Sequence, residues 1–210
     1  MKTGIILASS QQDKMEAIVD CVKKITQTMG YETVCFGIPA STLQTFSYVE
    51  TAVCISLLLD SKAVDFVVTG CSSGQGMMLA ANSLPGVLCG YVPTPSDAYL
   101  FGRINGGNAA SLPLKEGWGW QGRAHLQRTL EKLFEGPFGE GYPPHEADRK
   151  KRDTMLMKQI NHTVKRGWPE IADEMEAELM KNALRFPGVY DYILQNSSDE
   201  ALKNMLRAHR

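Results

Sequence analysis

The chain has 210 residues, of which 43% are hydrophobic and 21% are charged, as in an ordinary globular protein. Its formal net charge of -1 gives no electrostatic basis for binding nucleic acid or an anionic membrane surface. No apolar run approaches the ~20 residues that a membrane span requires, and the short run near the start predicts a strand rather than a signal peptide. We therefore expect neither nucleic acid nor a membrane as a partner.

The cysteines and histidines give no sign of a metal site. The five cysteines are scattered, and none forms a C-x-x-C pair or a cluster with the four histidines. An odd number of irregularly spaced cysteines is typical of reduced thiols in the cytosol. The sequence therefore predicts a cytoplasmic protein without a metal.

Apolar runs and helical patterns alternate along the first two-thirds of the chain. Strands are predicted, in chain order, at 3–7, 33–36, 65–69, 86–91 and 109–112. Helices are predicted at 14–29, 45–60, 75–83, 96–103 and 122–134. Alternation of this kind indicates right-handed β-α-β units. We expect an α/β fold with a doubly wound, Rossmann-like parallel sheet of about five strands between two helical layers.

The pattern changes after residue 135. Residues 136–144 are rich in glycine and proline, and the chain beyond them is charged and helical. This change predicts an α/β domain of residues 1–135 and a helical C-terminal extension of residues 136–210, packed on the core or on a partner subunit. Trp118, Trp120 and Trp168 are predicted to be packing or interface residues.

The most informative segment is the turn after the third predicted strand. It reads Gly70-Cys71-Ser72-Ser73-Gly74-Gln75-Gly76 and leads into a helix. Glycines let a ligand approach the main chain, and the first amides of a helix lack intrahelical partners at the positive end of its dipole. Open α/β sheets bind small molecules at the carboxyl ends of their strands. The turn therefore places a thiol beside an anion site.

Three known loop types do not fit this turn. Met77 and Met78 stand where a nucleotide-binding P-loop needs lysine and serine or threonine. Met77 also stands where a cysteine-dependent phosphatase loop needs arginine. The segment after the first strand, residues 8–12, has no glycine fingerprint for a dinucleotide. No cofactor is predicted.

Proton transfer next to a carbonyl is the chemistry that remains. A cysteine at a helix start ionises more readily than an ordinary thiol and can act as a general base. The amides of residues 73–76 could stabilise an enediolate, each well-placed donor contributing about 2.7–4 kcal/mol, and the Ser73 hydroxyl could bind the same oxygen. The alternative is that Cys71 is a buried structural cysteine.

Three motifs together resemble the ribose-5-phosphate isomerase B / galactose-6-phosphate isomerase family. They are residues 71–77 (CSSGQGM), residues 80–86 (AANSLPG) and residues 105–108 (NGGN), where the family has C-G-T-G-x-G-M, A-A-N-x-x-P-G and H-N-x-x-N. The resemblance covers about residues 1–134. It implies a sugar-phosphate aldose–ketose isomerase that acts through a cis-enediol without a cofactor. It also implies a homodimer, or a tetramer, with a shared active site.

The resemblance assigns roles to single residues. Cys71 falls on the catalytic base, and Ser73 replaces the threonine that assists at the substrate oxygen. Ser72, Gly74, Gln75 and Gly76 fall on the loop that holds the enediolate, and Asn105 falls on an asparagine that contacts the substrate. Two simpler roles remain open: Ser73 could cap the helix, and Asn105 could belong to a turn.

Two substitutions separate this chain from the family pattern. Ser10 and Gln11 align with the family's Asp-His pair, and because they follow the first strand we still expect them to contact the substrate. Ile104 aligns with the histidine that opens the sugar ring, and isoleucine cannot transfer a proton. The substrate is then already open-chain, or another group opens the ring.

The phosphate ligands have no clean counterpart in this sequence. Lys115, Arg149 and Arg152 are the predicted candidates, although the basic run 149–152 also fits a solvated helix face. Two alternatives therefore stay open beside the sugar-phosphate isomerase. One is a catalytically reduced relative that only binds a sugar phosphate, and the other is an isomerase of an open-chain or unphosphorylated sugar.

Overall fold

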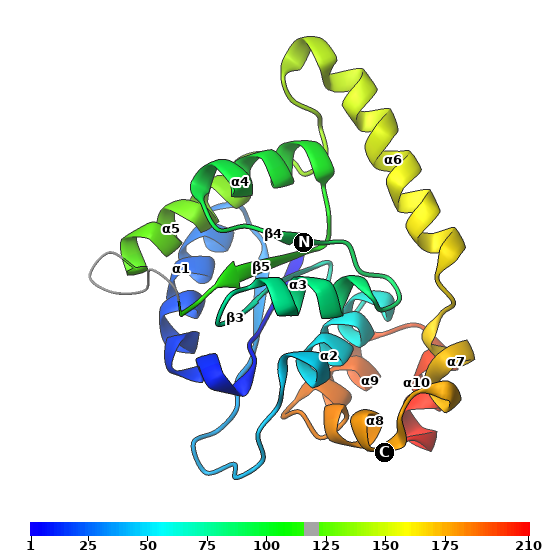
Figure 1. Ribbon diagram of the computed structural model, residues 1–210. Coiled ribbons are helices and arrows are strands. Elements are labelled where there is room, and N and C mark those ends of the chain that lie inside the picture. The colour runs from blue at the N-terminus through cyan, green and yellow to red at the C-terminus, as the bar shows by residue number, and fades with distance from the viewer. Residues whose placement is uncertain (116–121) are drawn as a thin grey trace.

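A parallel five-stranded sheet lies at the centre of the protein (Figure 1). The computed structural model describes residues 1–115 and 122–210, and Trp118 and Trp120 lie outside the described residues. The strands are β1 (Lys2–Ile6), β2 (Glu32–Phe36), β3 (Phe66–Cys71), β4 (Cys89–Tyr91) and β5 (Ala109–Pro113). Their order is β2-β1-β3-β5-β4, with every neighbouring pair parallel. The predicted doubly wound α/β fold is confirmed.

Helices cover both faces of the sheet. Helices α1 (Met15–Thr28), α4 (Pro95–Leu100) and α5 (Gly122–Leu133) pack on one face, and α2 (Tyr48–Asp60) and α3 (Gln75–Asn82) pack on the other. Successive side chains of a strand point to opposite faces. Ile5 accordingly joins the cluster under α1, whereas Ile6 joins the cluster under α2.

One strand is shorter than the sequence predicts. The fourth strand begins at Cys89 and not at residue 86. The side chain of Asn108 binds the backbone that precedes this strand. It accepts a hydrogen bond from the Leu88 amide (2.8 Å) and donates one to the Gly86 carbonyl (2.6 Å). The side chain takes the place of strand pairing there.

Helix α2 is covered on all sides. Its residues from Thr51 to Leu59 are buried, which is typical of a helix between two layers. Its outer side packs on the C-terminal helices α7 (Trp168–Ile171), α8 (Ala177–Ala183), α9 (Val189–Asn196) and α10 (Glu200–Ala208), which share its hydrophobic cluster. The division into two domains at residue 136 stays a prediction.

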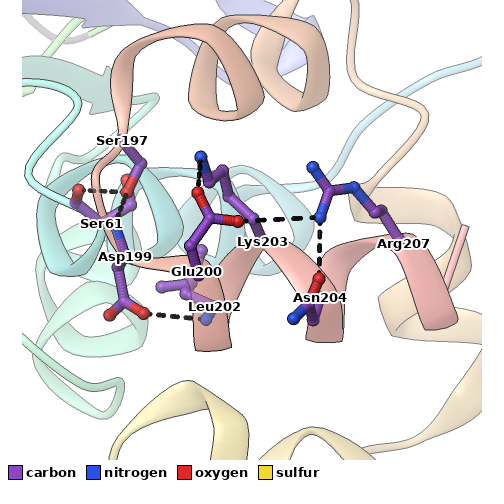
Figure 2. Close-up of polar contacts among 8 residues, drawn as sticks. All are labelled: Ser61, Ser197, Asp199, Glu200, Leu202, Lys203, Asn204 and Arg207. Atoms are coloured by element: carbon purple, nitrogen blue, oxygen red, sulfur yellow. Dashed lines mark hydrogen bonds and ion pairs between the residues drawn. The ribbon is translucent and has the colours of Figure 1, made fainter.

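Polar contacts attach the last helix to the end of α2 (Figure 2). The Ser197 hydroxyl donates to the carbonyl of Ser61, the residue that follows α2, over 2.7 Å. Asp199 caps α10 by accepting a hydrogen bond from the Leu202 amide (2.9 Å). These contacts fix the direction in which α10 leaves α9.

Helix α6 (Ala147–Val164) extends away from the rest of the protein along much of its length (Figure 1). Thr154 is its one buried residue, and its hydroxyl donates to the Ile104 carbonyl (2.6 Å). Leu156, Ile160 and Val164, spaced four residues apart, are 56%, 60% and 71% exposed. We call these three residues the α6 stripe. Across the described ranges, no helix has the length and apolarity of a membrane span.

The turn after β3 depends on close contact with β5. A Cβ atom at Gly70 would lie 2.5 Å from the Leu112 carbonyl oxygen, and one at Gly74 would lie 2.9 Å from the Pro113 nitrogen. Gly74 also has a φ of 75°, in the left-handed region that favours glycine. The Ser111 hydroxyl donates to the Gly74 carbonyl over 2.6 Å. These contacts hold the turn against the sheet.

The substitution Trp168→Phe tests whether the extension belongs to the core. Trp168 is fully buried, and its indole nitrogen donates to the Ser56 hydroxyl (2.8 Å), which itself donates to the Pro85 carbonyl (2.6 Å). Loss of the donor and of ring volume should lower the free energy of unfolding by about 1–3 kcal/mol in urea titrations. The exposed Tyr142→Phe should change it by less than about 0.5 kcal/mol. Equal stability of the two variants would contradict the packing described.

The substitution Gly74→Ala tests the turn. Both the φ of 75° and the missing space oppose a side chain, so unfolding should become easier by about 1–3 kcal/mol. The matched control is Gly37→Ala, because a Cβ there meets no heavy atom within 4 Å and no positive φ is required. Thermal unfolding of the two variants provides the comparison, and a Gly74→Ala protein as stable as Gly37→Ala would refute the need for glycine.

Candidate active site

A cleft of about 930 Å³ opens at the carboxyl ends of β1 and β3. The chain runs from β1 to β2 on one side of β1 and returns to β3 on its other side. Such a reversal leaves a crevice beyond the strand ends, where open α/β sheets bind their ligands. Of the residues predicted for the site, five line the cleft: Ser10, Cys71, Ser72, Ser73 and Gly76.

Cys71 is the cysteine of the cleft. It ends β3 and is 8% exposed, packed among core residues on one side and lining the cleft on the other. Burial raises the pKa of the Cys89 thiol to about 12 and raises that of Cys54 further, so both are protonated at neutral pH. Neither lines the cleft. Cys71 therefore has the position that a thiol base requires.

Unpaired amides accompany this thiol. The amides of Ser73, Gly74 and Gly76 donate to no other described residue, as expected at a helix start. The Gln75 amide donates to the Ser73 hydroxyl (3.3 Å) and the Met78 amide donates to the Gly74 carbonyl (3.1 Å). The N-cap of α3 is Gly74, which has no side-chain capping bond, so Ser73 forms a turn contact before the helix and is not its cap. Three further donors remain available for an oxyanion near the cleft.

Gln11 lies behind the cleft rather than in its wall. Its side chain is buried, and its amide nitrogen donates to the hydroxyls of Ser72 (3.0 Å) and Ser10 (3.2 Å). Its carbonyl oxygen is buried without a hydrogen-bond donor among the described residues. Gln11 thereby joins the loop after β1 to the loop after β3, and a direct contact with substrate stays a prediction.

Gly74 and Gln75 of the cysteine loop do not line the cleft either, and four further predicted residues lie outside it. Asn105 ends a π-helical turn (Phe101–Asn105) and is exposed. The exposed Lys115 approaches the loop only through its backbone amide, which donates to the Ser72 carbonyl (3.1 Å). Arg149 is on α6 and pairs there with Glu146 and Asp153, and Arg152 is exposed on the same helix. Substrate contacts for these residues stay predictions.

The second side of the cleft contains residues that the sequence analysis missed. They are Thr45, Phe46, Ser47, Tyr48 and Glu50 before and within α2, and Asn182 on α8. Ser47 and Glu50 form a capping box, whose S-x-x-E spacing is visible in the sequence and marks the start of α2 beside the cleft. No local signal identifies Asn182, because only tertiary packing brings α8 there.

The cleft has little charge of its own. Glu50 is the one charged side chain among the described residues of the wall, and its carboxylate accepts the Ser47 amide (2.6 Å). Neither lysine nor arginine lines the cleft in the part of the chain that the structure describes. An anionic substrate would therefore meet hydroxyls, amides and helix starts, unless another subunit supplies cations.

Known proteins resemble this chain over its full length. The family model of the ribose/galactose isomerases matches residues 5–142. The crystal structure of a 4-deoxy-L-threo-5-hexosulose-uronate ketol-isomerase complexed with a tartrate is 33% identical, covers 100% of this chain and 99% of its own, and has a TM-score of 0.93. A ribose-5-phosphate isomerase from Vibrio parahaemolyticus is 31% identical, and the match covers 100% of this chain and 99% of that protein, with a TM-score of 0.92. No match was found among curated proteins.

Shorter relatives share the fold alone. The type B ribose 5-phosphate isomerase of Trypanosoma cruzi is 20% identical and covers 78% of this chain but 99% of its own, with a TM-score of 0.64. The family match includes the cysteine loop, which lines the cleft, and Asn105, which lies outside it. The chain thus belongs to the ribose/galactose isomerase family and is a sugar isomerase of the aldose–ketose type.

Proposed function

We propose that the protein interconverts an aldose and its ketose through a cis-enediol, with Cys71 as the base. One observation carries this proposal: Cys71 lines a cleft at the switch point of the sheet, and the loop that follows it contains three unpaired amides. The thiolate accepts the proton from the carbon next to the carbonyl, and the same proton, or one from solvent, is returned to the former carbonyl carbon. The hydroxyl proton on the first of these carbons moves to the former carbonyl oxygen, so that the second carbonyl group forms. No external oxidant or reductant is needed, because the two carbons exchange oxidation states.

The loop stabilises the intermediate. Negative charge develops on the carbonyl oxygen as the proton leaves, and the amides of Ser73, Gly74 and Gly76 donate to it. The Ser73 hydroxyl, which accepts from the Gln75 amide, keeps its own proton to donate to the same oxygen. Held by Ser111 and β5, these donors need no rearrangement during the reaction.

The substrate that the site supports best is an open-chain sugar acid. Ile104 replaces the ring-opening histidine of the pattern, which suits a substrate without a ring. The wall of the cleft offers hydroxyls and amides, which can hold a singly charged carboxylate, whereas phosphate is usually bound with arginine or lysine. One full-length relative acts on a hexosulose uronate, and we infer a substrate of that chemical class.

A sugar phosphate is the second candidate. The other full-length relative is a ribose-5-phosphate isomerase, and its 31% identity is close to the 33% of the uronate isomerase. The phosphate would then need Arg149 or Arg152 from a partner subunit, since these side chains lie outside the cleft of their own chain.

We also propose that the protein is a homodimer with a shared site. The α6 stripe is an exposed apolar surface on a helix that extends away from its own core. Asn105 and the basic residues Arg149 and Arg152 accompany it, because the turn that ends at Asn105 is bound to α6 through Thr154. Burial of the stripe by a second copy would bring these polar residues toward the partner's cleft. A cytoplasmic location stays a prediction, supported by the five free cysteines.

The variant Cys71→Ala tests the assigned base. Loss of a general base should reduce turnover of a 4-deoxy-hexosulose uronate by about 100- to 10,000-fold and remove deuterium incorporation from heavy water. Cys35→Ala, at an exposed position on β2, should retain both activities. Retained deuterium exchange in Cys71→Ala would refute the assignment. If the unchanged protein bound the sugar without deuterium exchange, the alternative of a catalytically reduced relative that only binds its ligand would be favoured. Parallel assays with ribose 5-phosphate decide between the two substrate classes.

The variant Ile160→Asp tests the proposed dimer. A charge in the α6 stripe should convert the dimer to a monomer in sedimentation experiments, because an ionised carboxylate resists burial in an apolar interface. Gln195→Asp adds the same charge at an exposed position of α9 and should leave the dimer intact. Identical sedimentation of both variants and the unchanged protein would exclude the stripe as the interface.

A further inference from the structure

The C-terminal extension supplies one residue of the cleft wall. Asn182, at the end of α8, lines the same cleft as Cys71. It lies beyond residue 142, where the family match ends. Relatives from Trypanosoma cruzi and Thermotoga maritima cover 78% and 73% of this chain while matching nearly all of their own length. Asn182 therefore belongs to a part of the chain that the family match does not explain.

The position of Asn182 is fixed by packing on both sides. The next residue, Ala183, is buried, and its carbonyl accepts a hydrogen bond from the Cys54 thiol of α2 (3.2 Å). Phe186 packs against Phe46, itself a residue of the cleft wall, with 4.6 Å between ring centroids. These contacts hold the end of α8 against the start of α2.

The side-chain amide of Asn182 has donors to spare. Its oxygen accepts a long hydrogen bond from Gln44 (3.5 Å), which leaves the nitrogen without an acceptor among the residues that the structure describes. Asn182 is partly exposed and lines the cleft. An amide N–H binds an acceptor such as a carboxylate or hydroxyl oxygen.

We propose that Asn182 is a specificity-determining residue, which donates a hydrogen bond to a carboxylate oxygen of the substrate. This inference rests on the proposed function, in which the Cys71 loop holds C1 and C2 of an open-chain sugar acid. The far end of that chain then reaches the wall formed by α2 and α8. A neutral donor in a wall without lysine or arginine binds a carboxylate and leaves a doubly charged phosphate less well compensated.

The Tyr48 ring brings the two sides of the cleft together. It lies 3.5 Å from the position that a Cβ atom at Gly76 would occupy, so the start of α2 touches the cysteine loop. A ligand that extends from the Cys71 loop along this surface passes Tyr48 and meets Asn182. The extension thus contributes to substrate binding as well as to the stability of the protein.

Binding of glucarate tests the inference without relying on turnover. This six-carbon open-chain acid has a carboxylate at each end and no carbonyl to isomerise, so one carboxylate faces Asn182 in either orientation. Calorimetry on Cys71→Ala gives the reference affinity. Adding Asn182→Asp should weaken binding by about tenfold or more, because a donor becomes a repelling anion. Adding Asn182→Leu should weaken it less.

Asn204→Asp in the Cys71→Ala background is the matched control. Asn204 is on α10, where its side-chain oxygen accepts a hydrogen bond from Arg207 over 2.7 Å (Figure 2). It does not line the cleft. The affinity of this double variant for glucarate should equal that of Cys71→Ala alone. Equal affinities for the Asn182 and Asn204 variants, or no glucarate binding to Cys71→Ala, would overturn the role of Asn182. Deuterium exchange in the unchanged protein tests the proposed function separately, since it does not depend on residue 182.

Discussion

Contact between two neighbouring strands determines the geometry of this site. β5 lies so close to Gly70 in β3 and to Gly74 in the turn after it that a Cβ at either position would overlap the backbone of β5. The Ser111 hydroxyl and the Leu114 amide hold the carbonyls of Gly74 and Cys71. These bonds hold the turn by its carbonyls, while the amides of Ser73, Gly74 and Gly76 have no partner among the described residues. Backbone packing thus holds the loop that contains Cys71 and the unpaired amides.

The C-terminal extension changes what the family fold can recognise. In a protein of about 140 residues, α2 would present its outer side to solvent or to another subunit. Here that side is covered by α8 and α9, and the same packing brings Asn182 into the cleft. Helix α2 is apolar all around its axis because the extension covers it. The stability of the protein and the composition of the site therefore both depend on this packing. A change in the extension is expected to alter substrate preference while the cysteine loop stays unchanged.

The sequence predicts the parts that depend on local patterns. Alternating strands and helices, the glycine turn after β3 and the place of Cys71 at a strand end follow from periodicity and spacing, and the structure agrees on fold and cleft. The start of α2 was predictable from the Ser47–Glu50 capping box. Gln11 illustrates the limit: its place in the chain predicts a residue of the cleft, but only packing shows that it faces Ser72 instead. Asn182 had no signal, because a contact between α8 and the start of α2 joins segments that lie over 130 residues apart.

A crystal structure with a bound open-chain hydroxamate or aldonate of a sugar acid would test the central claim most directly. The account predicts that the carbons corresponding to C1 and C2 lie about 3–3.5 Å from the Cys71 sulfur, with their oxygens at the amides of Ser73, Gly74 and Gly76. A ligand found elsewhere, for example in the cavity of about 800 Å³ lined by Tyr190 and His209, would contradict it. So would a ligand in the cleft with its reacting carbons turned away from Cys71.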